Sequence, residues 1–304
     1  MSKQKGNKKK FINQDKIFDV VNVVIMIVML VVFTYPLWFV LIASISDPIL
    51  VMSGQVFLFP KGFTLDGYNN MMKYKELWTG YANTIFITAV GTVLNLVMSV
   101  CFAYPLSDKN FLPRRVLLMM FMFTMYFSGG LIPGYLVVKQ LGLLNTRWAM
   151  IIPSLVSVYN CLVIRSYFVN SIPGELEEAS LLDGANSVQH LWYIVLPLSK
   201  PVLAVVGLYY AVSHWNDYYN ALIYLYKEEL FPLQTVLRNL LLSAQALAND
   251  ASGVMDAAMM EEVFNRSLIM KYSVIIAAVV PMLCIYPFIQ KFFVKGVMVG
   301  SVKG

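Results

Sequence analysis

The side chains best suited to bind a ligand lie in one short stretch inside a long apolar run. Residues 213–220 read Ser-His-Trp-Asn-Asp-Tyr-Tyr-Asn. Aromatic faces beside amide and carboxylate groups suit a neutral polyhydroxylated ligand, because rings stack on C–H surfaces while amides and acids bind hydroxyls. The stretch therefore supplies candidates for a substrate path, namely Trp215, Asn216, Asp217, Tyr218 and Asn220. The same pattern fits a helix break in which Asn216 and Asp217 hydrogen-bond neighbouring helices.

Two isolated polar side chains in other apolar runs are weaker candidates for the same path. Tyr126 and Asn160 each lie among apolar neighbours. Polar groups inside a membrane are costly and usually face a cavity or another helix. A packing or helix-bonding role is the more typical explanation for both.

A second stretch, residues 173–201, is polar and lies between two apolar runs. Pro173 can open a helix, and Glu175, Glu177 and Glu178 place negative charge at the positive end of the helix dipole. Gly184 stands where a left-handed cap would end that helix. A second segment, 188–196, ends at Pro197. The pattern predicts two short helices around a turn, although an ordinary amphipathic connector also fits it.

Motifs for catalysis and cofactor binding are missing from the sequence. It contains no GxxxxGK[ST] phosphate loop, no HExxH or CxxC motif and no GxSxG motif. His190 and His214 are too far apart in sequence to suggest a metal pair. The three cysteines share no metal-ligand spacing and are typical of packing residues. We therefore expect no enzyme active site, metal site or cofactor on this chain.

The composition is that of an integral membrane protein. Of the 304 residues, 59% are hydrophobic and 13% charged, and the mean hydropathy is +0.66. Soluble domains have about 45–50% apolar and about 25% charged residues. The alternating segments of a β-barrel are missing, so an all-α membrane protein is predicted. The lysine-rich N-terminus before an apolar run indicates a topology signal, and nucleic-acid binding is not expected.

Six membrane spans are predicted from apolar runs long enough to cross a bilayer. They cover about 20–45, 81–106, 116–138, 148–168, 202–226 and 272–293. Pro36 predicts a kink or a distorted outer end in the first span. Gly130 and Gly134, with Pro133 between them, indicate close helix packing or a local break in the third. Short helices are expected after Thr64 and over 237–248 and 257–264.

The runs divide the chain into four parts. These are a disordered basic tail (1–16), the first span with an extracytoplasmic connection (17–80), a core of spans two to six (81–293) and a C-terminal tail (294–304). With the N-terminus in the cytoplasm, fourteen of the 23 Lys and Arg residues lie on the cytoplasmic side. Both termini and the 173–201 stretch are therefore expected there.

Three blocks of the 173–201 stretch carry a family resemblance. They are Glu178-Ala179-Ser180, Asp183-Gly184-Ala185 and Ile194-x-Leu196-Pro197. The spacing resembles the EAA loop of binding-protein-dependent ABC importer permeases, whose pattern is EAA, two residues, DGA, then I-x-LP. Ser180 and Leu191 depart from that pattern, the first by a small-for-small change. The WND sequence at 215–217 and the C-terminal GSVKG resemble the maltose-permease G-subunit branch. Residues 128–153 resemble permeases for aldouronate and other complex oligosaccharides.

The resemblance implies a six-span helical bundle of the type I ABC importer permease fold with a cytoplasmic coupling helix. It implies a multi-pass protein of the cell (cytoplasmic) membrane that moves an oligosaccharide. The implied partners are a second homologous permease, two ATPase subunits that bind ATP and Mg²⁺, and an extracytoplasmic sugar-binding protein.

The resemblance also assigns roles to single residues. Glu178 would make an ionic contact with an ATPase subunit, Ala179 and Ser180 would allow close docking, and Gly184 would make the turn. Asp183, Leu196 and Pro197 complete the coupling motif. A tail contact with the ATPase dimer is implied for Gly300, Ser301, Val302, Lys303 and Gly304.

Two other classes of protein are alternatives. A membrane-bound glycosyltransferase would use Asp217 with an acidic metal-binding motif, for which only the pairs Glu228-Glu229 and Glu261-Glu262 are available. Paired acids of this kind are more typical of a solvated face. A secondary transporter would need charged residues for ion coupling within its spans, and the spans contain no conspicuous set.

Overall fold

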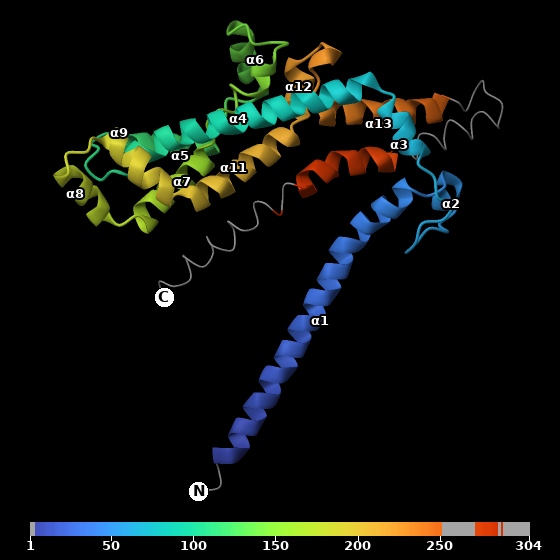
Figure 1. The fold of residues 1–304 in the computed structure, drawn as a ribbon, viewed down its shortest axis with the longest axis horizontal. Coiled ribbons are helices and arrows are strands. Elements are labelled where there is room, and N and C mark those ends of the chain that lie inside the picture. The colour runs from blue at the N-terminus through green and yellow to red at the C-terminus, as the bar shows by residue number, and fades with distance from the viewer. Residues whose placement is uncertain (1–3, 251–270, 285–286, 288–304) are drawn as a thin grey trace. The chain divides into compact units, whose positions relative to one another are not determined.

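The computed structural model describes residues 4–250, 271–284 and 287, and all its regular elements are helical (Figure 1). The chain divides into two compact units. Unit 1 comprises Met1–Lys73 with Ser243–Ala277, and unit 2 comprises Tyr74–Leu242 with Ala278–Gly304. The helix expected at 257–264, the end of the sixth predicted span and the tail residues 300–304 lie outside the described residues.

Unit 1 begins with one long helix, α1 (Gln4–Ser44). Its segment Lys16–Ser44 is long and apolar enough to cross a membrane. The disordered tail predicted for residues 1–16 is wrong from Gln4 onward, because lysine and glutamine are good helix formers and extend the helix of the span. The helix continues through Pro36. Two short helices follow, α2 (Pro48–Met52) and α3 (Asp66–Met72), and α3 confirms the helix expected after Thr64.

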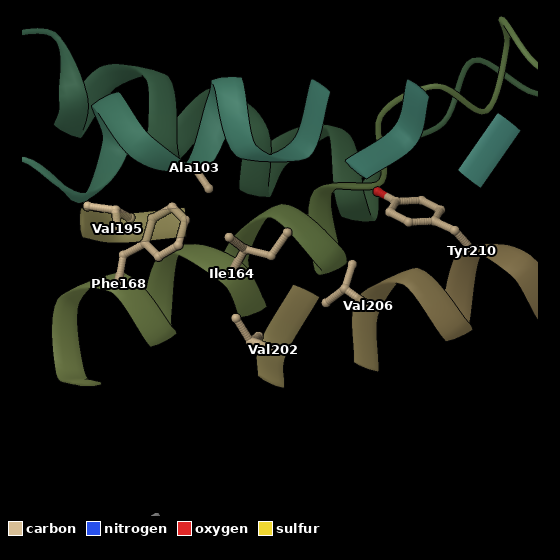
Figure 2. Close-up of a cluster of buried hydrophobic side chains, with 7 residues drawn as sticks. All are labelled: Ala103, Ile164, Phe168, Val195, Val202, Val206 and Tyr210. Atoms are coloured by element: carbon tan, nitrogen blue, oxygen red, sulfur yellow. The ribbon is translucent and has the colours of Figure 1, made fainter. Parts of the chain in front are cut away.

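The body of unit 2 consists of three helices that pack side by side, α4 (Lys75–Ser107), α7 (Val158–Ser171) and α11 (Lys200–Trp215). Figure 2 shows the apolar cluster between them. Ala103 comes from α4, Ile164 and Phe168 from α7, and Val206 and Tyr210 from α11. Burial of these side chains holds the three helices together. Of the described helices, α4 and the Lys16–Ser44 part of α1 could each cross a membrane unbroken.

The third predicted span is broken, as its glycines and proline indicated. It forms α5 (Arg114–Tyr126) and α6 (Leu131–Gln140), which meet at 114°. Gly130 lies at the break with a backbone φ of 87°, which residues other than glycine rarely adopt. A Cβ added at Gly134 would meet nothing within 4 Å, so the described part of the chain shows no close helix packing there.

The helix of the fourth predicted span begins later than expected, and the fifth predicted span is interrupted. Residues 147–150 form a 3₁₀ turn (η1, Arg147–Met150), and the helix of span four begins only at Val158, capped by the Ser157 side chain. Pro153, between these elements, cannot donate a backbone hydrogen bond to continue a helix. Span five divides into α11 and α12 (Tyr219–Tyr224).

Three further elements follow α12. A 3₁₀ turn, η3 (Glu228–Leu230), precedes α13 (Leu233–Asp250), which confirms the helix predicted over 237–248. The described part of the sixth span is a helix over Lys271–Cys284.

Candidate coupling site and translocation path

The 173–201 stretch folds as two short helices around a tight turn, as its sequence predicted. The first helix, α8 (Gly174–Leu182), ends at Asp183 as its C-cap. Gly184 follows with φ 78°. Its N–H donates to the Leu181 carbonyl at 3.0 Å, and the Ala185 N–H donates to the Ser180 carbonyl at 2.9 Å. These two bonds form a Schellman motif, for which glycine at the left-handed position is the preferred residue.

The second helix of the turn has its own cap. In α9 (Ser187–His190) the Asn186 side chain accepts from the Gln189 N–H at 2.8 Å. The Gln189 side chain accepts in turn from the Asn186 N–H at 2.9 Å. This reciprocal capping box satisfies donors that a helix start leaves unpaired. Local side chains therefore fix the geometry on both sides of the turn.

The helix does not end at Pro197, contrary to the sequence prediction. It continues from α9 through a π turn, η2 (Leu191–Val195), into α10 (Leu196–Leu198). Pro197 lacks an N–H and its ring would clash with the carbonyl four residues earlier, so a wider turn relieves the strain. The chain bends by 81° only at Ser199, between Ser187–Leu198 and α11.

An exposed apolar surface covers the turn. We call it the coupling face, and it comprises Leu181, Leu182, Val188, Trp192 and Tyr193. Leu182 is 89% exposed and Tyr193 74%. Several large apolar side chains left exposed on one short segment are typical of a protein or membrane contact.

The residues of the EAA-like motif divide between this exposed side and the interior of the unit. Glu178 and Ala179 are exposed beside the coupling face. Ser180 is buried, and its hydroxyl donates to the Glu177 carbonyl at 2.8 Å. Of the two small residues expected to allow close docking, only Ala179 is therefore accessible to a partner. Leu196 is half-buried and Pro197 exposed.

Side chains from two of the long helices, α4 and α7, anchor the coupling face. Val195 is buried in the apolar cluster with Phe168 and Ala103 (Figure 2). The Tyr167 hydroxyl donates to the Leu198 carbonyl at 3.1 Å. Tyr104, near the end of α4, lies 3.0 Å from the Ser187 carbonyl. A displacement of the coupling face would therefore be transmitted to α4, α7 and α11 through packed side chains.

The polar stretch of span five forms a helix break. α11 ends at Asn216, whose side-chain amide donates to the Val212 carbonyl at 2.9 Å. Asp217 accepts from the Asn220 N–H at 3.1 Å and from the Asn220 side-chain amide at 2.8 Å. Asp217 therefore stabilises the start of α12, as the helix-break interpretation predicted, and the Asn220 amide is engaged with it.

The remaining path candidates differ in whether their side chains are buried or exposed. Trp215 is buried, and its indole N–H donates to the Ala278 carbonyl at 3.1 Å. It acts within unit 2 as a packing residue. Tyr218 is 44% exposed, with the Arg238 guanidinium 6.0 Å from its ring centroid. Tyr126 is 79% exposed and Asn160 is buried. Tyr218, Asn216 and Tyr126 are thus the path candidates that this chain leaves accessible.

A buried polar contact between α4 and α11 was missed at the sequence level. His214 Nε2 lies 2.8 Å from Asn95 Oδ1. The Asn95 amide donates to the carbonyls of Ser154 and Leu155 at 2.6 and 3.0 Å. Ser99 and Tyr210 share a hydroxyl contact of 2.7 Å further along the same helices. Polar residues recur at 88, 92, 95 and 99, one face of a helix, and this spacing was the available signal.

A second set of polar contacts that the sequence analysis missed lies near the N-terminal end of α4. The Asn83 amide donates to the carbonyls of Glu229 and Phe231 at 2.8 and 3.1 Å. Arg147 Nε donates to Asn83 Oδ1 at 3.0 Å. Asn145, with φ 58°, accepts the N–H groups of Tyr226 and Lys227 at 3.1 and 3.0 Å. Asparagine side chains thus fix the loop that follows α12, a contact between segments about 80 to 150 residues apart.

Comparison with known proteins places the chain in a family. The model of the binding-protein-dependent transport system inner membrane component matches residues 89–299. Protein LplC of Bacillus subtilis is 38% identical over 289 residues, covering 95% of this chain and 96% of the relative. The polygalacturonan/rhamnogalacturonan transport system permease protein YtcP of the same organism is 35% identical, covering 96% of this chain and all of the relative.

A solved structure has the same fold. In the crystal structure of a bacterial ABC transporter involved in the import of the acidic polysaccharide alginate, one chain matches with a TM-score of 0.80 and 34% identity. The match covers 92% of this chain and 98% of that one. The resemblance drawn from the EAA loop is confirmed: the chain belongs to the binding-protein-dependent transport system inner membrane components, the permease subunits of ABC importers.

Proposed function

We propose that this chain is the permease subunit of an importer that moves an oligosaccharide across the cytoplasmic membrane. An extracytoplasmic binding protein delivers the sugar, and ATP hydrolysis on two separate ATPase subunits drives its passage. A second, homologous permease completes the path, and both termini lie in the cytoplasm. ATP and Mg²⁺ are bound by the ATPase subunits and not by this chain.

The observation that carries the proposal is the exposed coupling face on a turn fixed at both ends. Its apolar side chains need a partner, while its own caps and the anchors on Tyr104, Tyr167 and Val195 fix its position. A rigid element of this kind can convert closure of an ATPase dimer into rotation of the helices. Glu178 lies exposed beside it, as an ionic contact with the ATPase requires. We infer that the tail residues 300–304 reach the same partner.

An oligosaccharide substrate is supported by the relatives. Of the similar proteins, the permease YtcP is named for polygalacturonan and rhamnogalacturonan, and the solved transporter is involved in the import of alginate. We infer that the accessible side chains at the helix break, Asn216 and Tyr218, line the path. Trp215 and Asp217 shape the break from inside.

Uptake by the reconstituted complex tests the proposal. The permeases, ATPase and binding protein are placed in liposomes with ATP inside, and radiolabelled oligogalacturonides, alginate oligomers and maltooligosaccharides are offered outside. We expect ATP-dependent accumulation of at least one of them only when the binding protein is present. Accumulation without ATP, or transfer of sugar to a lipid without accumulation, would contradict an importer and favour one of the two alternative classes.

A further inference from the structure

The segment between α2 and α3 carries an apolar loop that folds back beside α1. Residues 56–63 read Val-Phe-Leu-Phe-Pro-Lys-Gly-Phe. The Trp38 indole N–H donates to the Leu58 carbonyl at 2.9 Å, and the ring centroids of Phe57 and Tyr35 lie 5.4 Å apart. Both α1 residues belong to the apolar segment Lys16–Ser44. In Figure 1 the chain after α2 doubles back beside the end of α1.

The contact with Tyr35 sets the depth that the loop reaches. Tyr35 precedes the end of α1 at Ser44 by nine residues, which is about 13 Å along a helix axis. The 29 residues of Lys16–Ser44 span about 43 Å, against about 30 Å for the hydrocarbon core and about 40–45 Å with the headgroup regions. The segment exceeds the hydrocarbon core by about 6–7 Å at each end, so a loop that extends back by about 13 Å passes the headgroups and reaches the outer part of the acyl-chain region.

The base of the loop is held firmly. The Asp47 N–H donates to the Lys61 carbonyl at 3.0 Å, and the Thr64 N–H donates to the Ile45 carbonyl at 3.1 Å. Gly62 lies between these bonds with φ 61°. A Cβ added there would lie 2.7 Å from the Cβ of Asp47, so the close approach of the two chain segments requires glycine. The loop is therefore a fixed projection beside α1.

Most side chains on this projection are apolar and exposed. Phe57, Leu58, Phe59 and Phe63 are all at least half exposed, and Phe59 is 74% exposed. They continue the exposed apolar surface of α1, where the side chains from Ile17 to Phe33 are also exposed. The bilayer already surrounds that surface in a membrane-spanning helix. Trp38 and Tyr35 beside the loop are the residue types enriched at membrane interfaces.

We propose that residues 57–63 form an interfacial anchor that inserts Phe57, Leu58 and Phe59 into the bilayer at the C-terminal end of α1. The occupant of this surface is lipid, because the loop is continuous with a lipid-facing helix and reaches back along it. Lys61 at the base extends its ammonium group toward lipid phosphates, as interfacial lysines do. The inference concerns unit 1 alone and does not depend on which sugar the importer carries.

Spin labels at single cysteines test the anchor in the assembled transporter. Cys101, Cys161 and Cys284 are first replaced by serine, and a nitroxide is attached to Phe59→Cys in complexes reconstituted into lipid nanodiscs. Gln55→Cys provides the control, since Gln55 is exposed on the same segment outside the apolar run. ATPase activity confirms that each labelled complex is intact. Collision rates with apolar oxygen and with a water-soluble nickel chelate then report depth.

We expect the label at position 59 to collide at least threefold more often with oxygen than with the nickel chelate, and the label at position 55 to show the reverse. Adding the binding protein is expected to leave both ratios unchanged. Three results would overturn the anchor. They are a water-exposed label at position 59, a label there that neither reagent reaches because a protein subunit covers it, and a label whose accessibility changes when the binding protein binds.

Discussion

Tyr104 holds the second helix of the coupling turn by its hydroxyl, which lies 3.0 Å from Nδ1 of His190 and 3.0 Å from the carbonyl oxygen of Ser187. His190 is buried, so this contact joins the end of α4 directly to α9. In an importer the coupling face must move with the ATPase, and α4 must move with the coupling face. The Tyr104 hydroxyl is one point at which this movement would pass from the turn to a long helix.

Replacing Tyr104 by phenylalanine is expected to loosen this connection without unfolding the chain. The change removes the hydroxyl contacts, each with a net value of about 0.5–1.5 kcal/mol. We expect assembly to be normal, and stimulation of ATPase activity by the loaded binding protein to fall about threefold or more. Tyr209→Phe is the control, because Tyr209 is 46% exposed on the neighbouring helix α11. Equal stimulation in both variants would show that Tyr104 does not connect the turn to α4.

Substitution at Gly184 tests the geometry of the turn. A side chain in the left-handed conformation costs about 1–2 kcal/mol, so Gly184→Ala is expected to disfavour the Schellman turn and lower uptake several-fold. Gly174→Ala, on the same helix, meets open space and is expected to transport normally. Initial uptake rates at matched complex concentration are the measurement. Wild-type rates for Gly184→Ala would mean that coupling tolerates a different turn.

Charge reversal at Glu178 tests its proposed contact with the ATPase. Glu178→Lys is expected to leave membrane insertion intact and to abolish both uptake and transport-stimulated ATPase activity. Glu175→Lys alters the same charge on an exposed residue in the first turn of α8 and is expected to have a smaller effect. Co-purification with the ATPase and uptake together check the prediction. Identical losses in both variants would indicate a general charge effect on α8.

The Asn95–His214 contact is expected to support the stability of unit 2. Asn95→Ala would leave His214 Nε2 and two backbone carbonyls without their partner, and unsatisfied buried groups cost about 1–3 kcal/mol each. We expect the thermal midpoint of the purified complex to fall by several degrees. Asn170→Ala removes an exposed asparagine at the end of α7 and is expected to change the midpoint by less than one degree. Similar midpoints would contradict a structural role for Asn95.

The close approach of Gly91 to the His214 ring gives an independent test of the same contact. A Cβ at Gly91 would lie 2.5 Å from His214 Nε2, so Gly91→Ala must displace the ring or separate α4 from α11. Gly134→Ala adds the same methyl group where nothing lies within 4 Å. We expect only the first variant to lower the thermal midpoint and the uptake rate. A midpoint unaffected by Gly91→Ala would show that the two helices tolerate a wider spacing.

The coupling turn was predictable because its determinants are local. Pro173, the three glutamates and Gly184 specify a helix and its end within one segment, and the structure confirms both. Pro197 was misjudged because the sequence shows a missing N–H but not the π turn that accommodates it. Because the π turn accommodates Pro197, the helix ends at Ser199 and not at Pro197 as predicted.

Which polar and aromatic side chains of the long helices are buried was less predictable, because burial depends on which segment packs against each side chain. Trp215 belongs by type to a sugar-binding surface, yet its indole bonds a carbonyl 63 residues away. Asn83, Asn95 and Asn145 each bond backbone groups on distant segments. Their sequence neighbours carry no trace of those partners. The helical spacing of polar residues on α4 was the one sequence pattern that indicated a buried polar contact.

The central claim is that the coupling face transmits ATP hydrolysis to the membrane helices, and one paired measurement tests it most directly. Leu182→Asp places a charge on that face at a side chain that is 89% exposed, and Leu112→Asp does the same at a side chain that is 95% exposed in the neighbouring α4–α5 loop. Uptake and binding-protein-stimulated ATPase activity are measured for both in the reconstituted complex. We predict that Leu182→Asp loses more than nine-tenths of both activities while Leu112→Asp keeps at least half. Full activity in Leu182→Asp would contradict the claim.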